Sequence, residues 1–66
     1  MTIDVDAVVA AQRELTAARR AFEEADTSKL TAAQARALDA ALRRRIEAAQ
    51  SGLTQARAAL RKASAA

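Results

Sequence analysis

Residues 26–34 read DTSKLTAAQ, and this stretch separates two segments that otherwise favour helix. Asp26, Thr27 and Ser28 favour turns because their side chains hydrogen-bond to nearby backbone groups. Thr31 and Gln34 have the spacing of a capping box, in which Thr31 accepts from the amide of Gln34 and Gln34 reaches back to the amide of Thr31. The stretch therefore predicts the end of one helix, a short turn and the start of another.

The composition on both sides of this stretch is that of an all-α chain. The 66 residues include 21 alanines, one glycine and no proline, and the commonest residue types head the intrinsic helix scale. We expect a single helical hairpin over residues 1–66, with a helix over 4–26, a turn over 27–30 and a helix over 31–63. A turn this short makes the two helices antiparallel neighbours.

Each segment carries a narrow apolar stripe in which large residues alternate with alanine. In the first segment Val8, Leu15 and Phe22 recur every seven residues, and an alanine follows each of them three positions later. In the second segment apolar residues recur at spacings of three and four. This is the pattern of a coiled coil, so we expect an alanine-rich, coiled-coil-like hairpin. With the turn centred near residues 28–29, Leu15 is expected opposite Leu42, and Leu60 extends past the start of the first helix.

The chain is short for a stable monomer, because small domains bury a small share of their surface. It has no cysteine for a disulfide and no histidine or cysteine for a structural zinc site, so association is the remaining common way to stabilise it. We expect an oligomer, or a hairpin docked on another protein. The predicted interface comprises the large residues of the two stripes: Val8, Leu15, Phe22, Leu42, Ile46, Leu53 and Leu60.

Charge is divided unevenly between the two segments. Residues 1–30 carry four basic and six acidic side chains, a net charge of −2, whereas residues 31–66 carry seven basic and two acidic ones, a net charge of +5. An acidic helix folded against a basic one is attractive, although each exposed ion pair contributes little.

The residue types argue against catalysis, metal binding and a cofactor. The chain has no histidine, cysteine, tyrosine or tryptophan, which removes the usual general bases, thiol nucleophiles and soft metal ligands. Glu23 and Glu24 are adjacent on a helix and diverge, so they cannot share a proton or a metal. We therefore expect a protein that is not an enzyme and needs no cofactor.

No apolar run approaches the length of a membrane span, and the N-terminal residues lack the basic and apolar regions of a signal peptide. We expect a cytoplasmic protein without a membrane partner, or one that joins a complex assembled inside the cell.

Arginines on the second segment offer an alternative function. Arg43, Arg44 and Arg45 are consecutive, and Arg36 and Arg57 lie on the same helix edge as Arg43 at heptad spacing. Such a stripe suits the phosphates of RNA or DNA. The same residues also suit a solvated flank that pairs with the acidic helix. No aromatic residue is available to stack on bases, which favours the second interpretation.

Gly52 leaves the second segment with two interpretations. The sequence Ser51-Gly52-Leu53-Thr54 resembles the turn of helix-turn-helix DNA readers, in which the glycine ends one helix and a third helix starts at Thr54. Against a break, the apolar spacing passes through Gly52 unchanged, and one glycine inside a helix costs only about 1 kcal/mol.

Two further resemblances concern shape and one short segment. The size and architecture resemble the small RNA-binding helical hairpins that regulate plasmid copy number, although their aromatic RNA contact has no counterpart here. Residues 14–21 are similar to the first helix of small phage head-completion proteins. We therefore expect a small phage or bacterial protein. Its leading function is a non-enzymatic assembly or adaptor module that acts through protein–protein helix packing, and the alternative is a dimeric nucleic-acid-binding hairpin.

Overall fold

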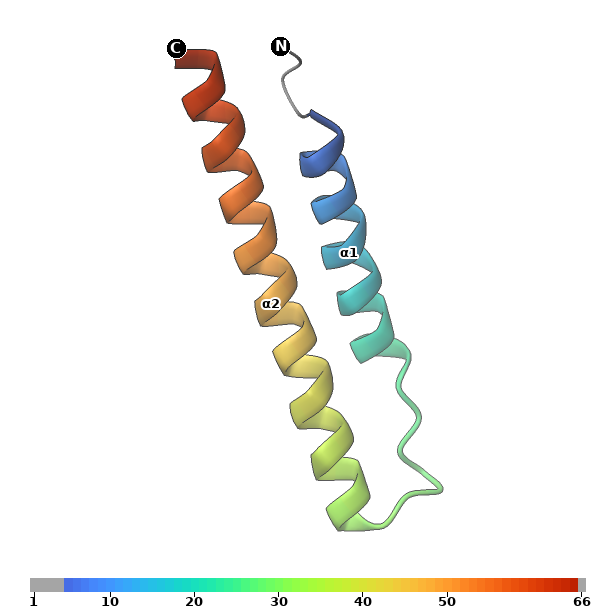
Figure 1. Ribbon diagram of the computed structural model, residues 1–66. Coiled ribbons are helices and arrows are strands. Elements are labelled where there is room, and N and C mark those ends of the chain that lie inside the picture. Colours follow the sequence, from blue (N-terminus) through green and yellow to red (C-terminus); the bar gives the residue numbers. More distant parts are fainter. Residues whose placement is uncertain (1–4, 66) are drawn as a thin grey trace.

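The computed structural model describes residues 5–65, which form two helices joined by one connection (Figure 1). Helix α1 spans Val5–Glu24 and helix α2 spans Ala32–Ala65. The start of α1 and the end of α2 lie at the same end of the molecule, so the helices are antiparallel. The predicted all-α, two-helix hairpin is confirmed. Its coiled-coil character and its oligomeric state stay predictions.

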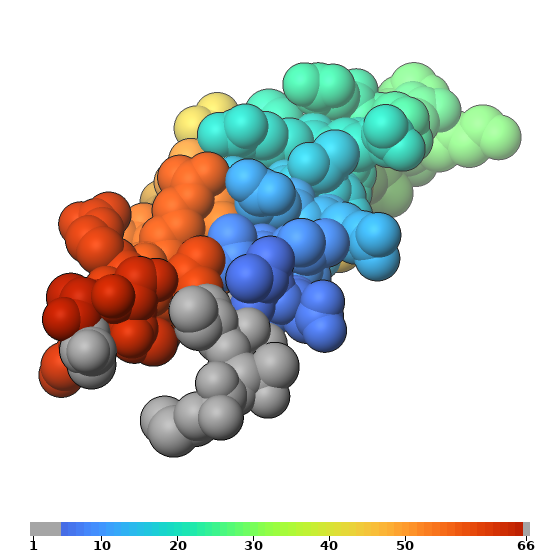
Figure 2. All heavy atoms as spheres, turned by 90° about the horizontal axis from the view of Figure 1, so that it is seen from above, coloured from blue at the N-terminus to red at the C-terminus, as the bar shows by residue number. Residues whose placement is uncertain are grey.

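The hairpin is a rod whose principal extents are 53, 14 and 13 Å. The view along the rod from the terminal end shows α1 directly against α2 (Figure 2). Two helices side by side leave every side chain near the surface, because each helix has a neighbour on one side only. This shape sets the limit on how much of the apolar stripe the chain can bury.

The start of α2 follows the capping box that the sequence predicts. The amide of Gln34 donates to Oγ1 of Thr31 over 3.1 Å, and the amide of Thr31 donates to Oε1 of Gln34 over 3.0 Å. The amide of Ala35 donates to the carbonyl of Thr31 over 2.8 Å, which is the first turn of the helix. Two backbone amides that a helix start leaves without partners are thereby satisfied.

Helix α1 ends at Glu24, two residues before the predicted end, and the connection is longer than the predicted turn. Residues 25–31 form it, and within them the amide of Ser28 donates to Oδ1 of Asp26 over 2.9 Å. Hydrogen bonds from the side chain and backbone of Ser28 hold the pKa of Asp26 below its ordinary value of 3.8. The predicted first helical residue, Asp4, lies outside the described residues.

The two helices meet at four buried apolar residues, which we call the seam: Leu15, Ala18, Ala49 and Leu53. Ala18 has no exposed surface, and Val8, Ala11 and Ile46 pack against the seam. The expected register, with Leu15 opposite Leu42, is wrong, because Leu15 clusters with Ala49 and Leu53 instead. The cause is the connection, which runs along the rod and lets α1 pair with a later part of α2 than a tight turn would.

The part of α2 that has no helix beside it is therefore at the turn end. The sequence instead predicts the main overhang at the other end, where Leu60 extends past the start of α1. Helix α2 begins well below the end of α1 in Figure 1, and there it has only the connection beside it. Ala35, Leu38 and Leu42 in this part are half-buried, and Leu60 near the other end is half-buried too.

Helix α2 continues through Gly52, so the helix-turn-helix interpretation is wrong. Gly52 lies inside Ala32–Ala65, and no glycine among the described residues has a positive φ. The apolar spacing on both sides of Gly52 keeps one face of α2 on the seam, and this outweighs the cost of the glycine.

Candidate interaction surfaces

The seven residues of the predicted partner interface fall into two groups. Leu15 and Leu53 are buried in the hairpin's own seam, at 8% and 7% exposure. The other five are half-buried and so keep part of their surface in solvent: Val8, Phe22, Leu42, Ile46 and Leu60. A substitution at Leu53 therefore tests the fold of the hairpin first and assembly second.

Three large apolar residues lie outside the seam and remain exposed. They are Val5 at 51%, Val9 at 37% and Leu30 at 37%. Val5 and Val9 belong to the first two turns of α1, and Leu30 belongs to the connection. Scattered exposed apolar residues are common on protein surfaces, so these three alone do not define a site.

One ion pair joins the two helices, between Glu14 of α1 and Arg45 of α2. The Arg45 guanidinium donates through Nη2 to Oε1 of Glu14 over 2.8 Å and through Nε to Oε2 over 3.4 Å. Hydrogen bonding from Arg45 lowers the pKa of Glu14 below 4.5, and the same contact raises the pKa of Arg45. The attraction between an acidic first helix and a basic second one thus takes the form of a two-bond, fork-like contact.

Arg43 is held on α2 beside the aromatic ring of α1. Its Nε donates to Oδ2 of Asp39 over 2.8 Å, one turn earlier on the same helix. Its guanidinium carbon lies 5.3 Å from the ring centroid of Phe22, within the range of a cation–π contact. Phe22 and Arg43 also line a hollow with Ile46 and Glu47. Arg43 is therefore engaged within the chain.

The remaining predicted nucleic-acid contacts are Arg36, Arg44 and Arg57. All three are exposed, and none has a hydrogen bond or ion pair with the part of the chain between residues 5 and 65. Of the five predicted arginines, the structure thus commits Arg43 and Arg45 to carboxylates and leaves three in solvent.

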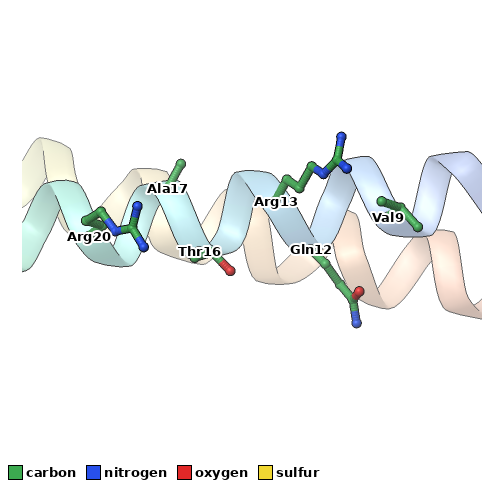
Figure 3. Close-up of a pocket in the computed structure, with 6 residues that line it drawn as sticks. All are labelled: Val9, Gln12, Arg13, Thr16, Ala17 and Arg20. Carbon is green, nitrogen blue, oxygen red and sulfur yellow. The ribbon is translucent and has the colours of Figure 1, made fainter.

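A second hollow lies on the outer side of α1, away from α2. Figure 3 shows its lining side chains, all from α1: Val9, Gln12, Arg13, Thr16, Ala17 and Arg20. A single helix provides no opposing wall, so this hollow does not enclose a small molecule in the way that ligand pockets do.

Residues 5–65 contain neither a cluster of metal ligands nor a helix apolar enough to cross a membrane. No group of three or more acidic, histidine or cysteine side chains in this range is placed to hold a metal ion. Neither α1 nor α2 has, over the same residues, an apolar stretch of the length that a bilayer crossing needs.

Comparison with protein families, with curated proteins and with solved structures finds no match to this chain.

The sequence interpretation missed the pair between Glu14 and Arg45, although a signal for it exists. The six positions that lie three, four or seven residues from Glu14 are all alanine. These positions are the neighbours of Glu14 on a helix surface, so no cation of α1 lies beside it. A partner for this carboxylate therefore had to come from the other helix.

Proposed function

We propose that this chain is a non-enzymatic assembly or adaptor module that acts through protein–protein helix packing, first of all with itself. One observation carries the proposal. Residues 5–65 contain eleven large apolar side chains, and only Leu15 and Leu53 among them are buried. The other nine stay half-buried or exposed, which is an unusually small core for a folded chain, and a partner is the physical means of covering them.

The accessible surface supports the same proposal. The chain exposes 5256 Å² at a mass of 7.0 kDa. A compact monomer of that mass exposes about 4,000 Å², so the hairpin leaves about 1,200 Å² more in water than the scaling for folded monomers. A standard interface buries about 800 Å² on each partner, so the excess is large enough for one.

The test measures mass and helicity together. Sedimentation velocity gives the molar mass of the full chain from about 1 to 100 µM, and circular dichroism at 222 nm gives its helicity at the same concentrations. We expect both to rise with concentration, because folding is linked to association. A fully helical monomer at low micromolar concentration would contradict the proposal.

A second candidate function has one observation in its favour. Arg36, Arg44 and Arg57 are exposed cations without protein partners among the described residues, and such side chains suit phosphate contacts. Nucleic-acid binding is nevertheless the weaker candidate. Arg43 and Arg45 already bond to carboxylates, and a phosphate would have to displace Asp39 and Glu14.

A matched pair of triple variants distinguishes the two candidate functions. Replacing Arg36, Arg44 and Arg57 with glutamine removes the three unpaired cations of α2. Replacing Arg13, Arg19 and Arg20 with glutamine makes the same charge change on α1. Fluorescence anisotropy against labelled duplex DNA and RNA, over a salt series, reads the outcome. We expect no tight binding by any of the three proteins. Salt-sensitive binding that only the α2 triple loses would establish the second function.

A further inference from the structure

Much of the uncovered apolar surface lies around the turn end of the hairpin. Of the nine large apolar side chains in residues 5–65 that are not buried, five lie between positions 22 and 46, and we call them the turn patch: Phe22, Leu30, Leu38, Leu42 and Ile46. Phe22 and Ile46 also line a hollow with Arg43 and Glu47. Over residues 32–42, α2 has only the connection beside it (Figure 1), so the chain provides no second helix for this part of the patch.

One edge of α2 next to the turn patch carries four charged residues of alternating sign. In chain order they are Arg36, Asp39, Arg43 and Glu47, at spacings of three, four and four residues. Because an α-helix turns by about 100° per residue, these spacings keep all four within about 80° of one another around the axis. Arg43 and Glu47 line the hollow with two members of the patch, so the edge borders it. We call these four residues the charged edge.

The hairpin pairs only the middle of the charged edge. Asp39 and Arg43 bond to each other over 2.8 Å, and their side chains stay 48% and 65% exposed. Arg36 and Glu47 are exposed and have no hydrogen bond or ion pair within residues 5–65. They are eleven residues apart, about 16 Å along the helix axis, which is too far for contact. The chain thus leaves a cation at one end of the edge and a carboxylate at the other.

The order of the charges matches a second copy of the edge when that copy is reversed. The edge is positive, negative, positive, negative, and the reversed edge has the opposite sign at each position. A two-fold axis beside Ala41 sets Arg36 of one copy opposite Glu47 of the other. The same axis sets Asp39 opposite Arg43. Antiparallel pairing therefore brings opposite charges together at all four positions, whereas a parallel copy in the same register brings like charges together.

The same axis also brings apolar side chains of the turn patch together. Leu42 follows Ala41, so the Leu42 side chains of the two copies meet near the axis, and Ile46 of each copy lies beside Ala35 of the other. Helix α2 then has a second helix in the part where its own chain provides only the connection. The surface in excess of a compact monomer, about 1,200 Å², exceeds the roughly 800 Å² per partner that a standard interface buries.

We infer that a second copy of this chain docks on the turn patch in antiparallel orientation, with the charged edges of the two α2 helices against each other. This inference rests on the proposed function and names its surface, its partner and the orientation of that partner. Each copy uses the same residues, so the contact closes at two copies.

The experiment exchanges the two unpaired charges of the edge in the full chain and measures association by sedimentation equilibrium. Arg36→Glu sets a carboxylate opposite Glu47 of the other copy, and Glu47→Arg sets a cation opposite Arg36. The double variant restores opposite charges across the axis. Because the two positions cannot touch within one chain, a restored affinity reports a contact between copies. Arg13→Glu is the matched control, because Arg13 is exposed on the outer side of α1 and has no ion pair among the described residues (Figure 3).

We expect a wild-type dimer and, in each single variant, a dissociation constant raised about tenfold, because symmetry creates two like-charge contacts. The double variant should return to within about threefold of wild type, and Arg13→Glu should leave the affinity unchanged. A single variant that merely failed to fold would not be rescued by a second charge change three turns away.

Single variants that associate like wild type would overturn the antiparallel pairing and leave the proposed function standing. A double variant that binds no tighter than the single variants would do the same, and so would a wild-type trimer. A fully helical wild-type monomer at low micromolar concentration would remove both the inference and the proposed function.

Discussion

The two halves of the hairpin are held together by different interactions. Near the termini, α1 and α2 lie against each other and bury the seam. Near the turn, residues 32–42 of α2 have only the connection beside them, and their large apolar side chains are half-buried (Figure 1). This turn half relies on the capping box and on local hydrogen bonds of the connection. Stability is therefore concentrated in the half that has a second helix, and the other half depends on local structure.

The largest effect is expected from a comparison of one leucine from each half. Leu53→Ala in the seam is expected to lower the free energy of unfolding by about 2–4 kcal/mol, because it removes a buried side chain and leaves a cavity. Leu38→Ala in the turn half is expected to cost about 1 kcal/mol, because water already reaches that side chain. Urea denaturation followed by circular dichroism, at equal protein concentration, measures both. Equal losses would mean that the two halves are equally well packed.

The next test concerns the closeness of the helices at Ala18, which has no exposed surface. Ala18→Leu forces extra volume between α1 and α2 and is expected to cost about 1–3 kcal/mol. Ala58→Leu makes the same change on the solvent side of α2 and is expected to stay within about 0.5 kcal/mol of wild type. Thermal unfolding of the two variants side by side reads the result. If both variants unfold like wild type, the helices are not in close contact at the seam.

The fold was predictable from the sequence because its signals are local. The absence of proline, the stripe spacing and the capping box at Thr31 and Gln34 each act within a few residues. The side-chain hydrogen bonds of that capping box are present in both directions, at 3.1 and 3.0 Å. Local signals of this kind do not depend on how the two helices pack against each other.

The register was not predictable for a reason that lies in the same stripes. A pattern of large residues and alanines that repeats every seven positions offers an equally apolar surface when one helix slides by one heptad. The path of the connection decides between such registers. Helix α1 ends at Glu24, and the amide of Ser28 donates to Asp26 in the connection. The connection runs beside the first turns of α2, so α1 pairs with a later part of α2 (Figure 1). The position of Arg45 against Glu14 follows from that register, so this ion pair was not predictable either.

A smaller effect is expected at the start of α2, where the turn half depends on Thr31. Thr31→Ala removes the hydroxyl that accepts from Gln34 and is expected to cost about 1 kcal/mol. Thr27→Ala is the control, because the Thr27 hydroxyl has no hydrogen bond with the residues that the structure describes. Backbone chemical shifts should show fraying over residues 32–35 in Thr31→Ala, with the seam unchanged. Loss of helix at the seam as well would mean that the two halves fold as one unit.

The smallest expected effect is the pH dependence of the pair between Glu14 and Arg45. Hydrogen bonding from Arg45 holds the pKa of Glu14 below 4.5 in the folded chain. A carboxylate with a lowered folded pKa contributes stability above its unfolded pKa and loses it as the pH falls through the folded pKa. The stability advantage of wild type over Glu14→Gln is therefore expected at neutral pH and should shrink as the pH falls below 4.5.

Urea titrations of wild type and Glu14→Gln, at several pH values from neutral to acidic, measure that difference directly. Glu23→Gln serves as the control, because Glu23 is an exposed glutamate of α1 without an ion pair among residues 5–65. Since Glu14 and Arg45 are half in solvent, added salt should also reduce the difference at neutral pH. A difference that grows as the pH falls, or one that is the same for Glu23→Gln, would show that the pair does not hold α1 to α2.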